Sequence, residues 1–155
     1  MYAPDTAFVA TPIGVLRIEG DAARVTRIAI VGQGAECAGT TAAVREAAAQ
    51  IAAYFAGRLR NFDLSLAPPA TPRGGVLRAA IVAIGHGGTA SYGELARITG
   101  SSARALGQAC ARNPFPIVVP CHRVLQAGGA LGPYSAGEGP VTKRWLLAFE
   151  GATLI

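Results

Sequence analysis

A cysteine and a histidine stand side by side at Cys121 and His122, in a chain of 155 residues with only three cysteines and two histidines. They follow an apolar run, 117–119, and Pro120, which predict a short buried strand or extended segment ending in a turn. Neighbouring side chains on extended backbone point to opposite faces, so the pair can cooperate only if the chain turns sharply. Two interpretations are open: a nucleophile with its base, or a buried cysteine beside an exposed histidine in an ordinary loop.

The other cysteines and histidine favour neither a metal site nor a disulfide framework. Cys37, Cys110 and Cys121 are scattered along the chain, and the two histidines add no ligand spacing, so we expect no metal and no cofactor. His86 has no acidic or cysteine neighbour and is expected in a solvent-exposed loop. The glycines around it match no phosphate-binding loop.

Composition predicts a globular chain with one domain or two small lobes, because 51% of its residues are hydrophobic and 15% are charged. No apolar stretch reaches the roughly 18 residues of a membrane helix, and no basic region with a long apolar core opens the chain. We therefore expect a cytoplasmic monomer without a membrane partner. The net charge of +5 favours a polyanion such as nucleic acid, although charge alone is weak evidence.

The first third of the sequence predicts strands followed by a helix. Residues 6–31 alternate between apolar and polar types around turn signals at 11–14 and 20–21. A helix should begin at Thr40 or Thr41 and end at Gly57. The proline-rich stretch 66–72 then predicts a boundary, with one lobe over 1–66, a linker over 67–72 and a second lobe over 73–155.

The second lobe should be mainly helical. Val76, Leu77, Ala80, Ile81 and Ile84 would share one face of its first helix. Residues 91–94 have the pattern of a capping box, and a further helix is expected from Ser101 or Ser102 to residue 112. Two short helices joined at a glycine have the outline of a helix-turn-helix. The small side chains of the second one suit either close helix packing or a helix lying deep in a DNA groove.

The last segment predicts a turn at Gly128-Gly129 and a final helix buried through Trp145, Leu146 and Phe149. Glu150 follows Leu147 closely on that helix. It could face inward, or it could be the solvated end of the helix.

Taken together, these motifs resemble the O6-alkylguanine-DNA alkyltransferases, the methylated-DNA–protein-cysteine methyltransferases. The resemblance covers nearly the whole chain and rests on Val119-Pro120-Cys121-His122-Arg123-Val124-Leu125, Ser91-Tyr92-Gly93-Glu94-Leu95-Ala96, Ala103-Arg104-Ala105-Leu106-Gly107, Asn113-Pro114, Tyr134-Ser135 and Lys143-Arg144-Trp145-Leu146-Leu147 through Glu150-Gly151. It implies an α/β fold for the N-terminal lobe, which would be ribonuclease-H-like. It also implies a mainly helical C-terminal lobe with a winged helix-turn-helix.

The resemblance implies a transfer that each molecule performs once. The alkyl group of O6-alkylguanine, or of O4-alkylthymine, would move to Cys121 while the guanine leaves. His122 would take the thiol proton through a water, Glu150 would orient the imidazole, and Tyr92 would protonate the departing base. The thioether formed on Cys121 cannot be hydrolysed.

The implied partner is double-stranded DNA containing O6-alkylguanine, bound through its minor groove. The damaged base must leave the stack to be attacked, and Arg104 would fill the space that it vacates, although a phosphate contact is the alternative. By the same resemblance Ser102, Ala105 and Gly107 lie at the DNA.

The resemblance implies a pocket formed by six residues that follow the second helix of the helix-turn-helix, the recognition helix. Asn113 would tie that helix to the active-site turn, and Pro116 and Tyr134 would wall the pocket. The backbone of Cys121, Val124 and Ser135 would read the guanine edge. Ala136 replaces a glycine found in many members, which predicts a narrower pocket and slower reaction with benzyl adducts. Arg123 is expected in a structural ion pair.

The departures from the family pattern, at Arg73-Gly74, Leu77 and Gly85-His86-Gly87, are expected to alter packing rather than chemistry. Three other functions are alternatives to transfer. A non-catalytic lesion sensor of the same fold would lack Cys121, and a transcription regulator would not need Cys121, His122 and Glu150 together. A Cys-His hydrolase would turn over many times.

Overall fold

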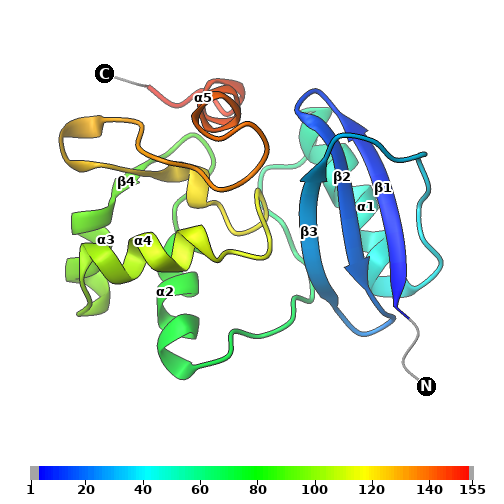
Figure 1. Ribbon diagram of the computed structural model, residues 1–155, viewed down its shortest axis with the longest axis horizontal. Helices are drawn as coiled ribbons and strands as arrows, with labels where there is room; N and C mark the ends of the chain where they lie inside the picture. The colour runs from blue at the N-terminus through cyan, green and yellow to red at the C-terminus, as the bar shows by residue number, and fades with distance from the viewer. Residues whose placement is uncertain (1–3, 154–155) are drawn as a thin grey trace. The chain divides into compact units, whose positions relative to one another are not determined.

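The computed structural model describes residues 4–153, which divide into two compact units between Ala67 and Pro68 (Figure 1). The N-terminal unit holds a sheet and one helix, and the C-terminal unit is mainly helical. No helix among the described residues is long and apolar enough to cross a membrane. Each unit has a hydrophobic core, and all the predicted site residues belong to the C-terminal unit.

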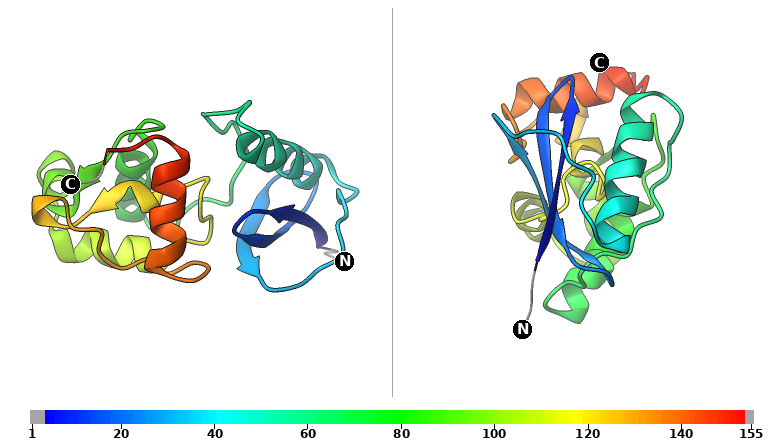
Figure 2. Two further views of the ribbon diagram at one scale, coloured as in Figure 1. Left: turned by 90° about the horizontal axis from the view of Figure 1, so that it is seen from above. Right: turned by 90° about the vertical axis from the view of Figure 1, so that its right-hand side faces the viewer.

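The N-terminal unit is a three-stranded antiparallel sheet with a helix along one face (Figure 2). The strands β1 (Asp5–Thr11), β2 (Gly14–Gly20) and β3 (Val25–Val31) pair in sequence order, and the helix is α1 (Ala42–Phe55). Alternate strand residues and one helix face meet in the core, which includes Ala7, Leu16, Ile18, Ile28, Val44, Ala47, Ile51 and Tyr54. The predicted strands and helix are confirmed.

The start of α1 is capped by a residue far away in the sequence. We predicted a cap from Thr40 or Thr41, and Thr41 is the N-cap residue, but its side chain accepts no capping hydrogen bond. Instead the Asp5 carboxylate accepts bonds from the backbone N–H groups of Thr40 and Thr41, both at 2.7 Å. These bonds from Thr41 and Thr40 lower the pKa of Asp5 to about 2. The first strand therefore holds the first turn of the helix.

The C-terminal unit contains four helices and a small parallel sheet in the part that the structure describes. The helices are α2 (Pro72–Val82), α3 (Tyr92–Thr99), α4 (Ala103–Ala111) and α5 (Pro140–Phe149). The sheet pairs β4 (Ala90–Ser91) with β5 (Val124–Leu125), and two 3-10 turns, η1 (Cys121–Arg123) and η2 (Ala127–Gly129), flank β5.

Local signals set the boundaries of α3 and α4 where the sequence predicted them. The Ser91 hydroxyl accepts from the Glu94 N–H while the Glu94 carboxylate accepts from the Ser91 N–H, which completes the capping box. Gly100 ends α3 with a φ of 65°, a conformation that costs glycine least. Ser102 caps α4 by accepting from Ala105 N–H. The two helices pack as the predicted helix-turn-helix.

The apolar run before the cysteine is not a strand, contrary to the prediction. Residues 116–118 form a turn, and Ile117 has a φ of 77°, which is uncommon for a β-branched residue. The run is buried as expected, and Val119 donates a backbone bond to Phe115. An apolar run of this length shows burial but does not show whether a neighbouring strand is there to pair with it.

Three smaller predictions about burial also need correction. On α5, Leu146 and Leu147 are fully buried, whereas Trp145 and Phe149 are only half-buried and stack on each other with ring centroids 5.0 Å apart. On α2, Val76 is 49% exposed, outside the predicted face. His86 is half-buried and makes a contact, so it is not a freely exposed loop residue. The predicted turn at residues 128–129 is confirmed, with positive φ at both glycines.

Candidate active site

Cys121 begins the 3-10 turn η1, so the chain does turn sharply after Pro120. Its side chain is buried, with 4% of the residue exposed. The Asn113 side-chain amide donates to its Sγ atom at 3.4 Å. This turn releases Cys121 and His122 from the opposite orientations that an extended chain would impose.

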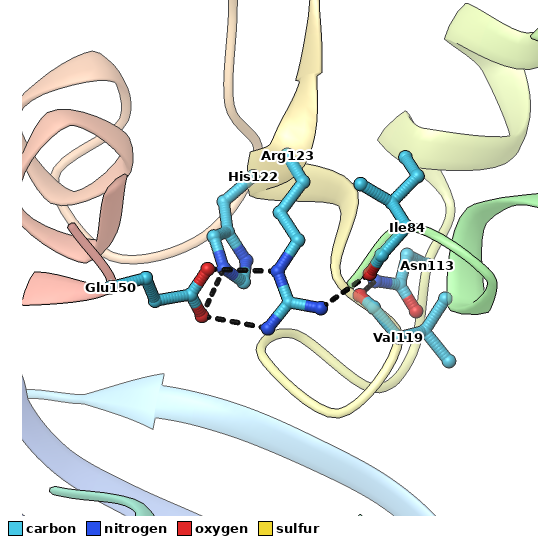
Figure 3. Close-up of polar contacts among 6 residues, drawn as sticks. All are labelled: Ile84, Asn113, Val119, His122, Arg123 and Glu150. Atoms are coloured by element: carbon cyan, nitrogen blue, oxygen red, sulfur yellow. Dashed lines mark hydrogen bonds and ion pairs between the residues drawn. The ribbon is translucent and has the colours of Figure 1, made fainter. Parts of the chain in front are cut away.

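His122, Arg123 and Glu150 form a buried network that joins η1 to the end of α5 (Figure 3). His122 Nε2 lies 2.9 Å from Glu150 Oε2. Arg123 grips the same carboxylate with two donors, Nε to Oε1 at 2.8 Å and Nη2 to Oε2 at 2.9 Å. Its Nη1 donates to the Ile84 carbonyl at 2.6 Å. The predicted ion pair of Arg123 is confirmed, and Glu150 is the inward-facing acid rather than a solvated helix end.

The network defines which nitrogen of His122 can act as a base. Glu150 as a carboxylate can only accept, so the bridging Nε2 must carry the hydrogen and Nδ1 keeps its lone pair. Nδ1 is buried and has no hydrogen-bond partner among the described residues. Burial lowers the pKa of His122, against the opposing pull of Glu150, so the ring is neutral near pH 7. A neutral imidazole with one unused acceptor is equipped to take a proton.

Cys121 does not stand alone, because Cys110 from α4 lies close enough for each thiol to shift the pKa of the other. Contact with Cys110 and burial raise the pKa of Cys121, while the Asn113 amide and the charge of Lys143 lower it. Two adjacent thiols do not both ionise readily, so they titrate as a pair. The resting acceptor is therefore a protonated thiol that needs a base. The sequence analysis placed Cys110 in a helix and did not predict that it would lie near Cys121.

Asn113 fixes the segment between α4 and η1 with three polar contacts. Its side-chain amide donates to the Val119 carbonyl at 2.9 Å as well as to the Cys121 sulfur (Figure 3). Its side-chain oxygen accepts from the Phe115 N–H at 2.9 Å. These bonds hold the segment that connects α4 to the turn η1, while the role of Asn113 in recognition stays a prediction.

A cavity of about 130 Å³ opens onto the Cys121 thiol, and its surface is mostly apolar. Its lining residues are Tyr92, Gly107, Cys110, Ala111, Cys121, Pro133, Tyr134 and Ser135. Burial raises the pKa of Tyr92 to about 12, so its phenol keeps its proton at neutral pH and can donate it. The Tyr134 hydroxyl is buried without a partner among the described residues, and burial also raises its pKa.

Four of the six predicted pocket residues do not line this cavity, and one of them is Asn113, whose contacts are described above. Pro116 is buried elsewhere, and Ala136 is half-buried outside the lining, so its narrowing effect stays a prediction. The Val124 backbone is already engaged, with its N–H bonded to Cys121 O and its carbonyl accepting from Lys143 Nζ at 2.7 Å. Ser135 does line the cavity and donates to the Cys110 carbonyl at 3.4 Å.

The residues predicted at the DNA lie along α4. Arg104 is exposed, Ser102 is the N-cap residue, and Ala105 is half-buried. Gly107 is one of the residues predicted at the DNA, and it also lines the cavity beside Cys121. The C-terminal unit contains eight Arg and Lys against three Asp and Glu, whereas the N-terminal unit has six of each. The entire net charge of +5 therefore belongs to the unit that contains α4.

Lys143 is a second site residue that the sequence reading missed. It is fully buried, and its Nζ donates to the carbonyls of Val124 and Pro133, at 2.7 and 3.2 Å. Burial lowers its pKa to about 8. Lys143 lies three and four residues before Leu146 and Leu147, so all three share the buried face of α5. This spacing is the sequence feature from which the burial of Lys143 could have been predicted.

Comparisons with known proteins agree with this geometry. Residues 76–152 match the family model for the DNA-binding domain of 6-O-methylguanine DNA methyltransferase. A methylated-DNA–protein-cysteine methyltransferase from Mycolicibacterium paratuberculosis is 40% identical, over 92% of this chain and 89% of its own length. A DNA base-flipping protein from Thermus thermophilus is 42% identical, over 92% and 97% of the two chains.

Solved structures give the same answer. Mycobacterium tuberculosis OGT, crystallised in complex with DNA, superposes with a TM-score of 0.81 at 36% identity, covering 94% of this chain and 92% of that one. The sequence identity extends over both units, and the buried Cys–His–Glu arrangement lies within the matched residues. The chain belongs to the O6-methylguanine DNA methyltransferase family.

Proposed function

We propose that the protein repairs DNA by transferring the alkyl group of O6-alkylguanine to its own Cys121. The observation that carries this proposal is the buried His122–Glu150 pair, whose unused ring nitrogen belongs to the residue that follows Cys121 in the turn η1. Cys121 itself lines a small cavity as a protonated thiol. A protein that only bound the lesion would have no use for a base at that position.

The reaction proceeds as a displacement at the alkyl carbon. The Cys121 proton passes to His122 Nδ1, and one water can bridge the gap because no direct hydrogen bond links the two described side chains. Glu150 then stabilises the imidazolium. The sulfur forms its new bond to carbon as the carbon–oxygen bond breaks. Tyr92 donates a proton to the guanine that leaves, and its pKa of about 12 means that the proton is present.

The proposal explains why each molecule acts once. A thioether has no leaving group that water could displace, so Cys121 is not regenerated. O6-alkylguanine is the proposed substrate, and O4-alkylthymine, with an analogous alkyl–oxygen bond, is a second substrate to assay. We propose that the protein acts as a cytoplasmic monomer whose repair module is the lobe 73–155, linked by 67–72 to the lobe 1–66.

Entry of the base requires that it leave the duplex. We place Arg104 in the vacated stack and the N-terminal part of α4, with Ser102, Ala105 and Gly107, in the minor groove. Arg104 is exposed, and the small residues around it allow close approach, which supports this placement. The net positive charge of the same unit adds attraction to phosphates.

The test is to incubate the protein with duplex DNA containing O6-methylguanine and to measure its intact mass. We expect a gain of one methyl group per molecule, located at Cys121, and no gain in Cys121→Ala. Cys37→Ser is the matched control and should react fully, since Cys37 lies in the other unit. DNA binding without a gain in mass would instead identify a non-catalytic lesion sensor, and the Thermus relative is named a DNA base-flipping protein. A methyl gain that survived Cys121→Ala would also refute the proposal.

A further inference from the structure

The cavity contains two thiols, although the transfer reaction uses only one. Cys110 and Cys121 both line it, and both are buried, with 8% and 4% of each residue exposed. The two thiols lie close enough for each to shift the pKa of the other. Asn113 bonds to both cysteines. Its backbone N–H donates to the Cys110 carbonyl at 3.3 Å, and its side-chain amide donates to the Cys121 sulfur at 3.4 Å.

We propose that Cys110 and Cys121 form a reversible disulfide when the pocket meets a hydroperoxide, and that this bond protects the acceptor from irreversible oxidation. Both cysteines are free in the structure, so the dithiol is the starting state. Both thiols face one cavity of about 130 Å³, so they can approach each other without leaving the pocket. Disulfide formation itself goes beyond alkyl transfer and requires no DNA, whereas its protective role rests on the proposed function of Cys121 as the alkyl acceptor.

The chemistry is balanced by one hydroperoxide. A thiolate of the pair attacks the peroxide oxygen, the O–O bond breaks, and hydroxide or alkoxide leaves, which produces a sulfenic acid. The second thiol then attacks that sulfur, the S–O bond breaks, and water leaves with the thiol proton as the S–S bond forms. The pair loses two electrons and the peroxide gains them. Whichever sulfur is attacked first, the product is the same disulfide, and a dithiol reductant reverses it.

The neighbouring thiol matters because the acceptor is consumed in use. A solitary sulfenic acid reacts with more peroxide to give a sulfinic acid, which thiols do not reduce. A one-shot acceptor lost in that way never repairs a lesion. Cys110 diverts the first oxidation product into a form that the reducing cytosol restores. Cys37 is exposed and does not line this cavity, so we do not assign it to the pair.

The experiment treats reduced wild-type protein with graded hydrogen peroxide, blocks remaining thiols after denaturation, and maps the peptides by mass. We expect the loss of two hydrogen atoms, a peptide joining Cys110 to Cys121, and Cys37 still blocked by the reagent. Dithiothreitol should restore both thiols. Protein first methylated by O6-methylguanine DNA should form no such link. Failure of wild-type protein to form the joined peptide before sulfinic acid appears would overturn the proposal, whether or not any variant folds.

Two variants separate protection from simple reactivity. Cys110→Ser should accumulate sulfinic acid at Cys121 and, after peroxide and then reductant, recover several-fold less of its own untreated alkyl acceptance than wild type. Cys37→Ser is the matched control and should recover as wild type does. Equal recovery in Cys110→Ser and wild type would refute the protective role, and a disulfide that used Cys37 would refute the assignment of the pair.

Discussion

At the scale of single residues, the site depends on one carboxylate that serves two partners. Glu150 holds the imidazole of His122 in one tautomer and neutralises the buried guanidinium of Arg123. Removing the Glu150 carboxylate would leave the charge of Arg123 buried without a partner, which lowers the free energy of unfolding. The same carboxylate orients His122, the proposed base. Stability and reactivity are therefore linked at this residue.

Replacing Glu150 by Gln should lower the free energy of unfolding by about 3–5 kcal/mol, because Arg123 remains buried and charged. Urea unfolding followed by the fluorescence of Trp145, the only tryptophan, reports on this unit. Glu138→Gln, at an exposed glutamate, is the control and should change it by no more than about 0.5 kcal/mol. The double variant with Arg123→Met should lose less than the sum of the two single losses. Additive losses would contradict the coupling.

The protonation of His122 should determine how the free energy of unfolding and the rate of transfer change with pH. The pKa of His122 in the folded protein lies below its ordinary value of 6.5. As the pH drops below 6.5, the unfolded chain therefore binds a proton more readily than the folded protein does. The free energy of unfolding should therefore fall as pH drops below about 6.5, by at most about 1.4 kcal/mol per pH unit. Transfer should slow in the same direction, since a protonated ring is no base.

Unfolding and single-turnover methyl transfer measured from pH 7.5 to pH 5 would check this (about the range in which histidine titrates). His122→Gln should lose the component of the stability change that His122 contributes. His86→Gln, at the only other histidine, should keep it. A profile unchanged by His122→Gln would contradict the assignment.

At the scale of elements, short-range signals explain what the sequence could predict. The capping box of α3, the Ser102 cap of α4 and the turn after Pro120 each involve residues within a few positions of one another. Asp5 capping α1 and Lys143 bonding to Pro133 join segments that no local pattern connects. The backbone at Ile117 was misread for the same reason, because burial, not strand pairing, explains its apolar run.

Asn113 lets this element-scale argument be tested. Asn113→Ala removes the donor to the Val119 carbonyl and should lower the free energy of unfolding by about 1–3 kcal/mol. It should also slow transfer, because the turn that carries Cys121 loses its tie to α4. Asn61→Ala, at an exposed asparagine of the other unit, is the control for both measurements. Slower transfer with unchanged stability would limit Asn113 to its contact with the sulfur.

At the scale of the whole molecule, charge is divided unequally. The N-terminal unit is electrically neutral overall, and the C-terminal unit contributes the net charge of +5. Because phosphate contacts release counterions, DNA affinity should fall steeply as salt rises. The division predicts that this dependence originates in one unit.

Arg104→Gln should weaken binding to duplex DNA and reduce the slope of log affinity against log salt by about 1 if Arg104 contacts a phosphate. If Arg104 occupies the vacated stack, methyl transfer should fall more than binding does. Arg60→Gln, at an exposed arginine of the neutral unit, should leave slope and transfer unchanged. Titrations at several salt concentrations together with single-turnover transfer distinguish the two roles, and no effect on either would exclude Arg104 from the interface.

The position of Glu150 in the chain has a consequence for protein synthesis. Its carboxylate joins the 3-10 turn at residues 121–123 to the end of α5 and, through Arg123, to the Ile84 carbonyl. A growing chain emerges from its N-terminus, so the acceptor thiol is made well before α5. In the proposed mechanism, Cys121 has no oriented base until α5 has been translated and has docked. We therefore expect the nascent chain to carry its nucleophile in an unactivated state and to become reactive only when Glu150 reaches His122.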